Sequence, residues 1–67
     1  MPQPQYYIGL TVRCVKPCKG HEPGDVGQIW LVDEKGIYLR SIPGYHRTDW
    51  QIEEPLPADC FEPWSPP

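Results

Sequence analysis

The chain has 67 residues, enough for one small domain that buries only roughly 60% of the surface its unfolded form exposes. Its 10 prolines and 6 glycines, with no apolar spacing of helical period, exclude a helical bundle and predict an all-β fold. The net charge of −3, from 6 basic and 9 acidic residues, weighs against a protein that binds nucleic acid through clustered Lys and Arg.

The N-terminal part is predicted to hold one strand and one long loop. Residues 1–5 contain two prolines and two glutamines and are expected to be a flexible lead-in. Between Ile8 and Cys14 every second residue is apolar, which is the pattern of a strand with one buried face. Cys14 is in phase with that face and is therefore predicted to be a small core residue. Residues 16–25 contain two prolines, two glycines and four charged residues, which predict a loop.

The next segment, GDVGQIWLVDEKGIYLR at residues 24–40, is predicted to form a β-hairpin. Ile29 and Leu31 share one face of its first strand. Ile37 and Leu39 share one face of the second strand. The two apolar faces lie on the same side of the hairpin only if the residue numbers of each cross-strand pair add up to an even number. A three-residue turn at 34–36, with Gly36 in the left-handed position of a bulge, satisfies this condition. The pairs it predicts are Leu31 with Leu39, Trp30 with Arg40 and Val32 with Tyr38, the last two on the outer surface.

After the hairpin, the sequence predicts a turn and another strand. Pro43-Gly44 is a typical turn pair. Residues 48–53 are predicted to form a short strand in which Trp50 and Ile52 share a face.

The C-terminal segment is predicted to end the fold with a helical turn, a strand and a tail. Residues 56–61 predict a single 3₁₀ turn that leads into a last strand at residues 60–62. Residues 63–67 form a proline-rich tail, which cannot join a sheet ladder because proline has no N–H to donate. The isolated Trp64 is expected to pack back onto the domain.

This order of features resembles that of the small SH3-like barrels. The run Gly-Asp-x-Gly-x-Ile-x-x-Val-Asp at residues 24–33 is similar to the turn and strand of the KOW-type modules among them. The resemblance covers about residues 7–64 and implies a five-stranded, partly open barrel over residues 6–62 that binds through its loops and has no catalytic chemistry. The chain departs from both kinds of relative. Its charges after Arg47 are all acidic, unlike those of RNA-binding KOW modules, and it lacks the ALYDY-type motif of classical SH3 domains.

The sequence also predicts where the protein is found. It contains no run of about 18 apolar residues, and its start lacks the charged and apolar regions of a secretory signal. Its 3 cysteines, an odd number, cannot all pair within one chain, which indicates a reducing compartment. We therefore expect a cytoplasmic protein with no membrane association.

The cysteines and one histidine offer the ligand types of a Cys₃His zinc site, which would help to hold so small a domain together. Its members would be Cys14, Cys18, His21 and Cys60. Core packing is favoured over zinc, because Cys60 is remote in sequence and Cys14 is in phase with the buried face. A disulfide from Cys14 or Cys18 to Cys60 ranks lower in a reducing compartment. We therefore expect no cofactor and no metal, with zinc as the alternative.

Catalytic motifs are absent from the sequence. It has two serines and two histidines, and no Gly-x-Ser-x-Gly, His-Glu-x-x-His or phosphate-binding glycine loop. His46 and Asp49 have the residue types of a base and its orienting carboxylate, but such pairs in loops are more often solvated. We expect that the protein is not an enzyme.

Aromatic residues are the strongest functional signal. The chain has 3 Trp, 4 Tyr and 1 Phe, more than a small core needs, and Trp and Tyr anchor protein interfaces. Trp50 and Phe61 are assigned to the core, whereas the outer face of the hairpin and the loop at 43–49 are expected to be exposed. The candidate interface residues are Trp30, Tyr38, Arg40, Tyr45, His46 and Arg47. The sequence thus predicts a small non-enzymatic binding module, an accessory or regulatory subunit, whose partner is another protein.

Two alternative functions stay open at this point. A KOW-like module that binds nucleic acid or the ribosome would need its basic residues to converge on one face. These residues are Arg13, Lys16, Lys19, Arg40 and Arg47. A small inhibitor of a nucleic-acid-binding protein would instead imitate phosphates with acidic residues. The acids concerned are the five from Asp49 to Glu62, and neutralising Glu53, Glu54 and Asp59 together should then abolish inhibition.

Overall fold

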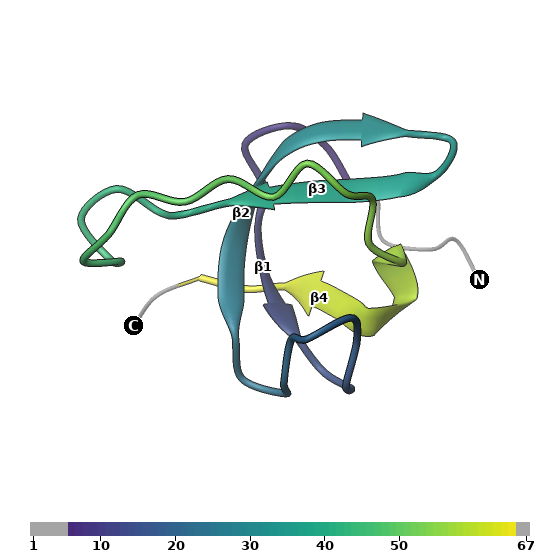
Figure 1. Cartoon of the computed structure of the whole chain (residues 1–67), viewed down its shortest axis with the longest axis horizontal. Coiled ribbons are helices and arrows are strands. Elements are labelled where there is room, and N and C mark those ends of the chain that lie inside the picture. The colour runs from purple at the N-terminus through teal and green to yellow at the C-terminus, as the bar shows by residue number, and fades with distance from the viewer. Residues whose placement is uncertain (1–5, 66–67) are drawn as a thin grey trace.

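The computed structural model describes residues 6–65 and shows a small all-β domain (Figure 1). Its four antiparallel strands form one open sheet in the order β3-β2-β1-β4, and a 3₁₀ turn precedes the last strand. The elements are β1 at Thr11–Cys14, β2 at Val26–Asp33, β3 at Gly36–Arg40, η1 at Ala58–Cys60 and β4 at Phe61–Pro63. The all-β class and the 3₁₀ turn are therefore confirmed. The predicted lead-in, residues 1–5, and the end of the tail, residues 66–67, lie outside the described residues.

Strand β1 is shorter than the alternating pattern predicted. It begins at Thr11, because the chain turns at Ile8 and Gly9, where Gly9 has a φ of 99°. Ile8 is 64% exposed, so its predicted place on the buried face is wrong. Val12 and Cys14 are buried in the core, as the pattern predicted.

A two-residue turn, Glu34-Lys35, joins β2 to β3 because Asp33 pairs directly with Gly36. The predicted three-residue turn is therefore wrong. Asp33 Oδ1 accepts hydrogen bonds from the N–H of Lys35 (2.8 Å) and of Gly36 (3.3 Å), and its Oδ2 accepts one from the Tyr38 hydroxyl (2.9 Å). Partial desolvation of Asp33 acts to raise its pKa, but these hydrogen bonds outweigh it and hold the pKa below its ordinary value.

The hairpin register follows from this turn and from a bulge in β2. Next to the turn Leu31 lies opposite Tyr38, and a register shift at Trp30 then brings Ile29 opposite Leu39. The bulge adds one residue to β2, so Ile29 and Leu39 lie opposite each other in the core, a pair that the sequence did not predict. The pairs predicted wrongly are Leu31–Leu39, Trp30–Arg40 and Val32–Tyr38.

The strand predicted at residues 48–53 does not form as a continuous strand. Residues 50–56 run beside β3 and pair with it only at isolated points. The N–H groups of Ile52 and Leu56 each donate to a β3 carbonyl at 2.8 Å. Residues 53–55, which include Pro55, lie between these two donors, whereas only Tyr38 lies between the two acceptors, Ile37 and Leu39. The ladder is therefore interrupted. The sheet therefore has four strands, with a partly attached segment along β3.

The C-terminal segment crosses from the β3 edge of the sheet to the β1 edge (Figure 1). There β4 pairs antiparallel with β1, from Phe61 opposite Cys14 to Pro63 opposite Val12. The strand thus extends to Pro63, beyond the predicted end at residue 62. The N–H of Trp64 then donates to the Thr11 carbonyl at 2.9 Å, so Trp64 packs back onto the domain as predicted.

The buried core draws on β1, β2, β3, the attached segment, η1 and β4. It is made of Val12, Cys14, Ile29, Ile37, Leu39, Leu56, Cys60 and Phe61. The predicted core positions of Cys14 and Phe61 are confirmed. Within residues 6–65, no helix has the length and apolar content needed to cross a membrane.

Candidate binding surface

The loop that follows β3 is closed at its base by Ser41 and Trp50. The Ser41 N–H donates to the Trp50 carbonyl (2.8 Å), and the Trp50 N–H donates to Ser41 Oγ (3.0 Å). Inside the loop, the Ile42 N–H donates to His46 Nδ1 (2.7 Å), and the Ile42 carbonyl accepts from the N–H of Tyr45 and of His46 at 3.0 Å each. The loop therefore holds Tyr45 and His46 by its own hydrogen bonds, at the end of the molecule seen on the left of Figure 1.

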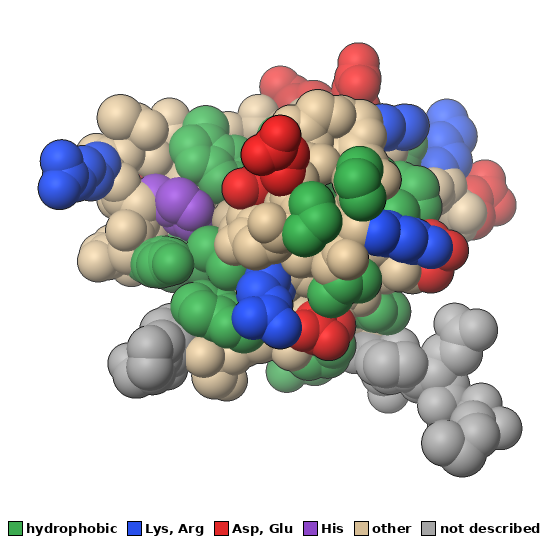
Figure 2. All heavy atoms as spheres, turned by 90° about the horizontal axis from the view of Figure 1, so that it is seen from below, with side chains coloured by type: hydrophobic (Ala, Val, Ile, Leu, Met, Phe, Trp, Pro, Cys, Tyr) green, Lys and Arg blue, Asp and Glu red, His purple; other side chains and the backbone are tan. Residues whose placement is uncertain are grey.

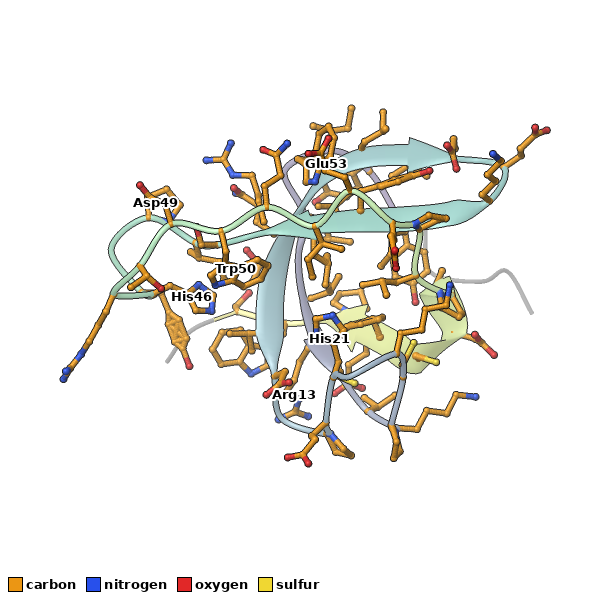
Figure 3. All side chains as sticks on the ribbon, viewed as in Figure 1. Arg13, His21, His46, Asp49, Trp50 and Glu53 are labelled. Atoms are coloured by element: carbon orange, nitrogen blue, oxygen red, sulfur yellow. The ribbon has the colours of Figure 1, made fainter. Side chains whose placement is uncertain are left out.

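A row of aromatic rings runs from Trp50 through His46 and Tyr45 to Trp64. The ring centroids are 5.1 Å apart for Trp50 and His46, 5.1 Å for His46 and Tyr45, and 5.7 Å for Tyr45 and Trp64. Figure 3 shows His46 and Trp50 side by side under the loop. Tyr45 is 48% exposed, and the other three rings are half-buried. We call these four residues the aromatic surface.

Gly27 in β2 makes room for the Trp50 ring. Gly27 is buried, and a Cβ at this position would lie 3.3 Å from the ring and 3.2 Å from the Leu39 side chain. A glycine inside a strand often marks such a close approach. Trp50 therefore packs against the core, as predicted, and at the same time forms part of the surface.

Two cavities share Trp50 as a wall. The smaller, of about 250 Å³, is lined by His21, Asp25, Val26, His46 and Trp50. The larger, of about 510 Å³, is lined by Arg40, Ser41, Pro43, Asp49, Trp50 and Gln51. Each cavity thus combines the Trp50 ring with one carboxylate. An aromatic face beside a carboxylate attracts a cationic side chain.

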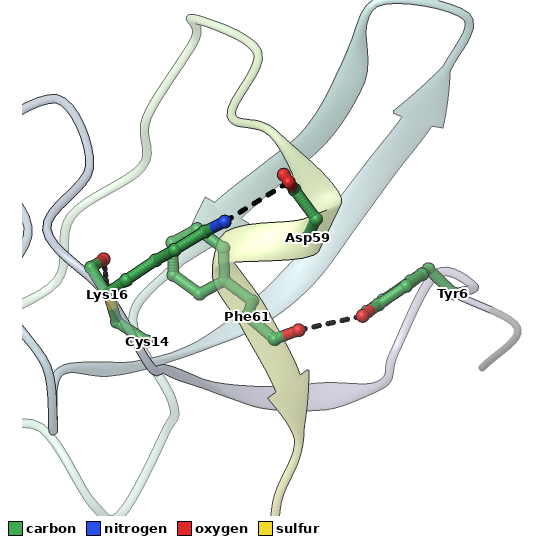
Figure 4. Close-up of polar contacts among 5 residues, drawn as sticks. All are labelled: Tyr6, Cys14, Lys16, Asp59 and Phe61. Atoms are coloured by element: carbon green, nitrogen blue, oxygen red, sulfur yellow. Dashed lines mark hydrogen bonds and ion pairs between the residues drawn. The ribbon is translucent and has the colours of Figure 1, made fainter. Parts of the chain in front are cut away.

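The basic residues of the N-terminal part are held by acceptors of the C-terminal part. Arg13 forms an ion pair with Glu62 (2.6 Å) and Lys16 forms one with Asp59 (3.3 Å; Figure 4). Lys19 Nζ donates to a backbone carbonyl at 3.2 Å. On the face shown in Figure 2, Lys and Arg side chains are separated by acidic and hydrophobic ones, and hydrophobic side chains gather beside a histidine.

The sequence-predicted interface residues divide into two groups. Tyr45 and His46 belong to the aromatic surface, Arg40 lines the larger cavity, and Arg47 is exposed in the same loop. Trp30 and Tyr38 instead pack against each other, with ring centroids 5.8 Å apart.

The predicted exposure of Tyr38 is wrong, since its exposed fraction is 8%. Its hydroxyl is held by Asp33, and that hydrogen bond, followed by burial, raises the pKa of Tyr38. Trp30 is half-buried because its Nε1–H donates to the Ile52 carbonyl at 3.0 Å. These two rings therefore support residues 50–56 against the hairpin.

Sequence reasoning did not place Trp50, Trp64 or the carboxylates of Asp25 and Asp49 at this surface. For Trp50 a signal existed, because Gly27 interrupts the apolar pattern of a predicted strand, where a large ring from another segment fits. For Trp64 the sequence predicted packing onto the domain but gave no contact partner.

The proposed zinc ligands are not arranged as a metal site. Among residues 6–65, no group of three or more His, Cys, Asp or Glu side chains is placed to hold a metal ion. The His21 ring packs edge-on against Phe61 with centroids 6.1 Å apart, and its Nδ1 lies 4.0 Å from Asp25 Oδ2. The described geometry therefore gives the zinc hypothesis no support.

Comparison with known proteins identifies no relative: no family model, no curated protein and no solved structure matches the chain significantly. The proposals below therefore rest on the residues and the geometry of this chain.

Proposed function

We propose that this chain is a small, non-enzymatic SH3-like module that binds another protein through the aromatic surface. The observation that carries this proposal is the row from Trp50 to Trp64, which borders two cavities. A few residues carry most of the binding energy at protein interfaces, and Trp and Tyr are enriched among them because each buries a large area.

The strand arrangement supports an SH3-like interpretation. Residues 50–56 run beside β3 and provide a broken fifth strand next to the β3-β2-β1-β4 sheet. The chain then passes through η1 to the opposite edge, a crossing that would partly close the sheet in an SH3-like barrel. In such a module the loops at one end carry the binding residues, and here the loop after β3 carries Tyr45 and His46.

The smaller cavity favours a partner segment with a basic side chain, because Asp25 lines it without a Lys or Arg, whereas Arg40 lines the larger cavity together with Asp49. Asp25 and Asp49 line the two cavities, and within residues 6–65 Asp49 takes part in no ion pair. A peptide segment that presents a Lys or Arg next to apolar side chains would contact the Trp50 ring and one of these carboxylates together.

Affinity capture from a lysate of the source organism, with and without nuclease, tests this proposal. The wild type is compared with Tyr45→Ala and with Tyr7→Ala, a matched control that removes an equally exposed tyrosine outside the aromatic surface. We expect a protein that survives nuclease and whose retention falls about tenfold with Tyr45→Ala, the effect of an interface anchor. Tyr7→Ala should leave retention unchanged.

Two results would contradict the proposal. Equal retention by the two variants would place the interface elsewhere. Capture that disappears with nuclease and weakens steeply with added salt would favour the KOW-like alternative. The engagement of Arg13, Lys16 and Lys19 by acceptors within the chain argues against that outcome.

A further inference from the structure

The cysteines of this chain gather at one place although they are far apart in sequence. Cys14 ends β1, Cys60 ends η1, and Cys18 packs against the core cluster that contains both. The sulfur atoms drawn in yellow in Figure 3 lie together beside η1 and the start of β4. The fold therefore brings the three thiols to the same side of the core.

The three thiols differ in their hydrogen bonds and in their exposure to solvent. The Cys14 thiol donates to the Lys16 carbonyl at 2.9 Å (Figure 4), and Cys14 is 1% exposed. Cys60 is 7% exposed, whereas Cys18 is half-buried and is the thiol that solvent reaches most easily. The Cys14 thiol is thus engaged by the Lys16 carbonyl. Cys18 and Cys60 remain as a pair of thiols, which solvent reaches at Cys18.

The backbone fixes Cys18 close to Cys60. Two hydrogen bonds between Cys18 and His21, of 3.0 and 2.8 Å, close the turn that carries Cys18. The Val15 N–H donates to the Cys60 carbonyl at 2.8 Å, which ties η1 to the chain just before that turn. Burial, followed by a hydrogen bond with the Cys60 thiol, raises the pKa of Cys18. Cys18 therefore packs against the core cluster that contains Cys60, on the same side of the core.

We propose that Cys18 and Cys60 form a reversible disulfide when the protein meets a peroxide such as hydrogen peroxide, with Cys18 as the attacking thiol and Cys60 as the resolving thiol. The Cys18 thiol first loses its proton, and its raised pKa keeps the thiolate fraction small near neutral pH, so the reaction is slow. The thiolate then attacks one peroxide oxygen, the O–O bond breaks, and the leaving hydroxide takes up a proton to become water. Cys18 is thereby oxidised to a sulfenic acid and the peroxide is reduced.

The second step joins the two residues. The Cys60 sulfur attacks the sulfenic sulfur, the S–S bond forms and the S–O bond breaks. The departing hydroxide leaves as water with the Cys60 proton, so two thiols and one peroxide give one disulfide and two waters. The bridge links residues 16–25, which carry His21 and Asp25 of the smaller cavity, to η1.

Thiol counting by mass spectrometry tests this inference. The folded wild type and Cys14→Ser, Cys18→Ser and Cys60→Ser are treated with hydrogen peroxide, alkylated and weighed intact. We expect Cys14→Ser to lose about 2 Da, to leave no thiol for alkylation and to regain both thiols with dithiothreitol. Cys18→Ser should form no disulfide within the chain.

Cys14→Ser is the decisive variant because its two remaining thiols allow only one intramolecular bridge, and because the test does not depend on the folding of Cys60→Ser. Two free thiols in oxidant-treated Cys14→Ser would overturn the inference. Disulfide formation in Cys18→Ser at the wild-type rate would also overturn it, since the bridge would then join Cys14 to Cys60.

Discussion

Strands β1 and β3 flank β2, and their outer edges are covered in different ways. At the β1 edge, β4 forms a regular ladder that is reinforced by the Arg13–Glu62 ion pair and by a hydrogen bond of 2.7 Å from the Tyr6 hydroxyl to the Phe61 carbonyl. At the β3 edge, residues 50–56 touch the strand only at isolated points.

This difference is consistent with the place that we propose for partner binding. The β1 edge pairs its charges and backbone groups within the chain. At the β3 edge the ladder is incomplete. Trp50 begins the segment beside this edge and closes the base of the loop that contains Tyr45 and His46. The aromatic surface therefore lies next to the less regular edge.

The largest effect is expected from breaking the attachment at the β3 edge with Gly36→Ala. Gly36 has a φ of 149°, and a Cβ there would overlap the Leu56 carbonyl, which accepts a hydrogen bond from Ile37 at 2.9 Å. We expect the free energy of unfolding in urea to fall by about 3 kcal/mol, from backbone strain and the lost pairing. Gly20→Ala is the control, since Gly20 also has positive φ but open space around it. An equal loss in both variants would contradict the role of Leu56.

A smaller effect is expected at the β1 edge from Tyr6→Phe. This change removes the hydroxyl that donates to the Phe61 carbonyl but keeps the ring that packs on the core. The expected loss in the free energy of unfolding is about 1 kcal/mol, the net contribution of one hydrogen bond. Tyr7→Phe, at an exposed position, should change stability by less than about 0.5 kcal/mol. If the two variants are equally stable, the Tyr6 hydrogen bond does not hold the edge.

The hairpin between the two edges should depend on pH through Asp33. Because the folded-state pKa of Asp33 is lowered, its stabilising contribution is complete above the unfolded value of about 3.9 and is lost as pH falls through the folded value. Asp33→Asn should therefore be less stable than the wild type at pH 7, and the difference should shrink on acidification. Glu34→Gln, in the same turn, is the control, because it removes a carboxylate that accepts none of these hydrogen bonds. A constant difference for Asp33→Asn would contradict this account.

The smallest effect is expected from the Arg13–Glu62 ion pair. Both side chains are nearly half exposed, so solvent and salt screen their attraction. A double-mutant cycle with Arg13→Ala and Glu62→Ala should give a coupling below about 1 kcal/mol that decreases further in 1 M salt. A larger, salt-independent coupling would mean that this pair dominates the β1 edge.

The sequence predicted the parts of the fold that depend on local alternation and turn chemistry. Val12 and Cys14 are buried in β1, the hairpin forms, and the 3₁₀ turn precedes β4, all as expected. The register was predicted wrongly because β2 contains a bulge at Trp30. Apolar alternation in the sequence does not show where a bulge lies. The strand predicted at residues 48–53 does not form continuously, because its pairing with β3 depends on which of residues 50–56 reach the β3 carbonyls.

The candidate site was predicted only in part. The loop residues Tyr45 and His46 were placed correctly in an accessible loop, because turn residues surround them. Trp30 and Tyr38 were assigned to the outside by face alone, whereas residues 50–56 cover them through the Trp30–Ile52 hydrogen bond. Such a contact is a property of the folded chain, and no spacing in the sequence encodes it.

The central claim, that the aromatic surface is where a partner protein binds, is tested most directly by site-specific photo-crosslinking. Benzoylphenylalanine is placed at position 45 in one protein and at position 7 in another, and both are irradiated in a lysate of the source organism. We expect a discrete protein adduct from position 45 that is absent from position 7 and unaffected by nuclease. Adducts of the same kind from both positions, or from position 7 alone, would contradict the claim.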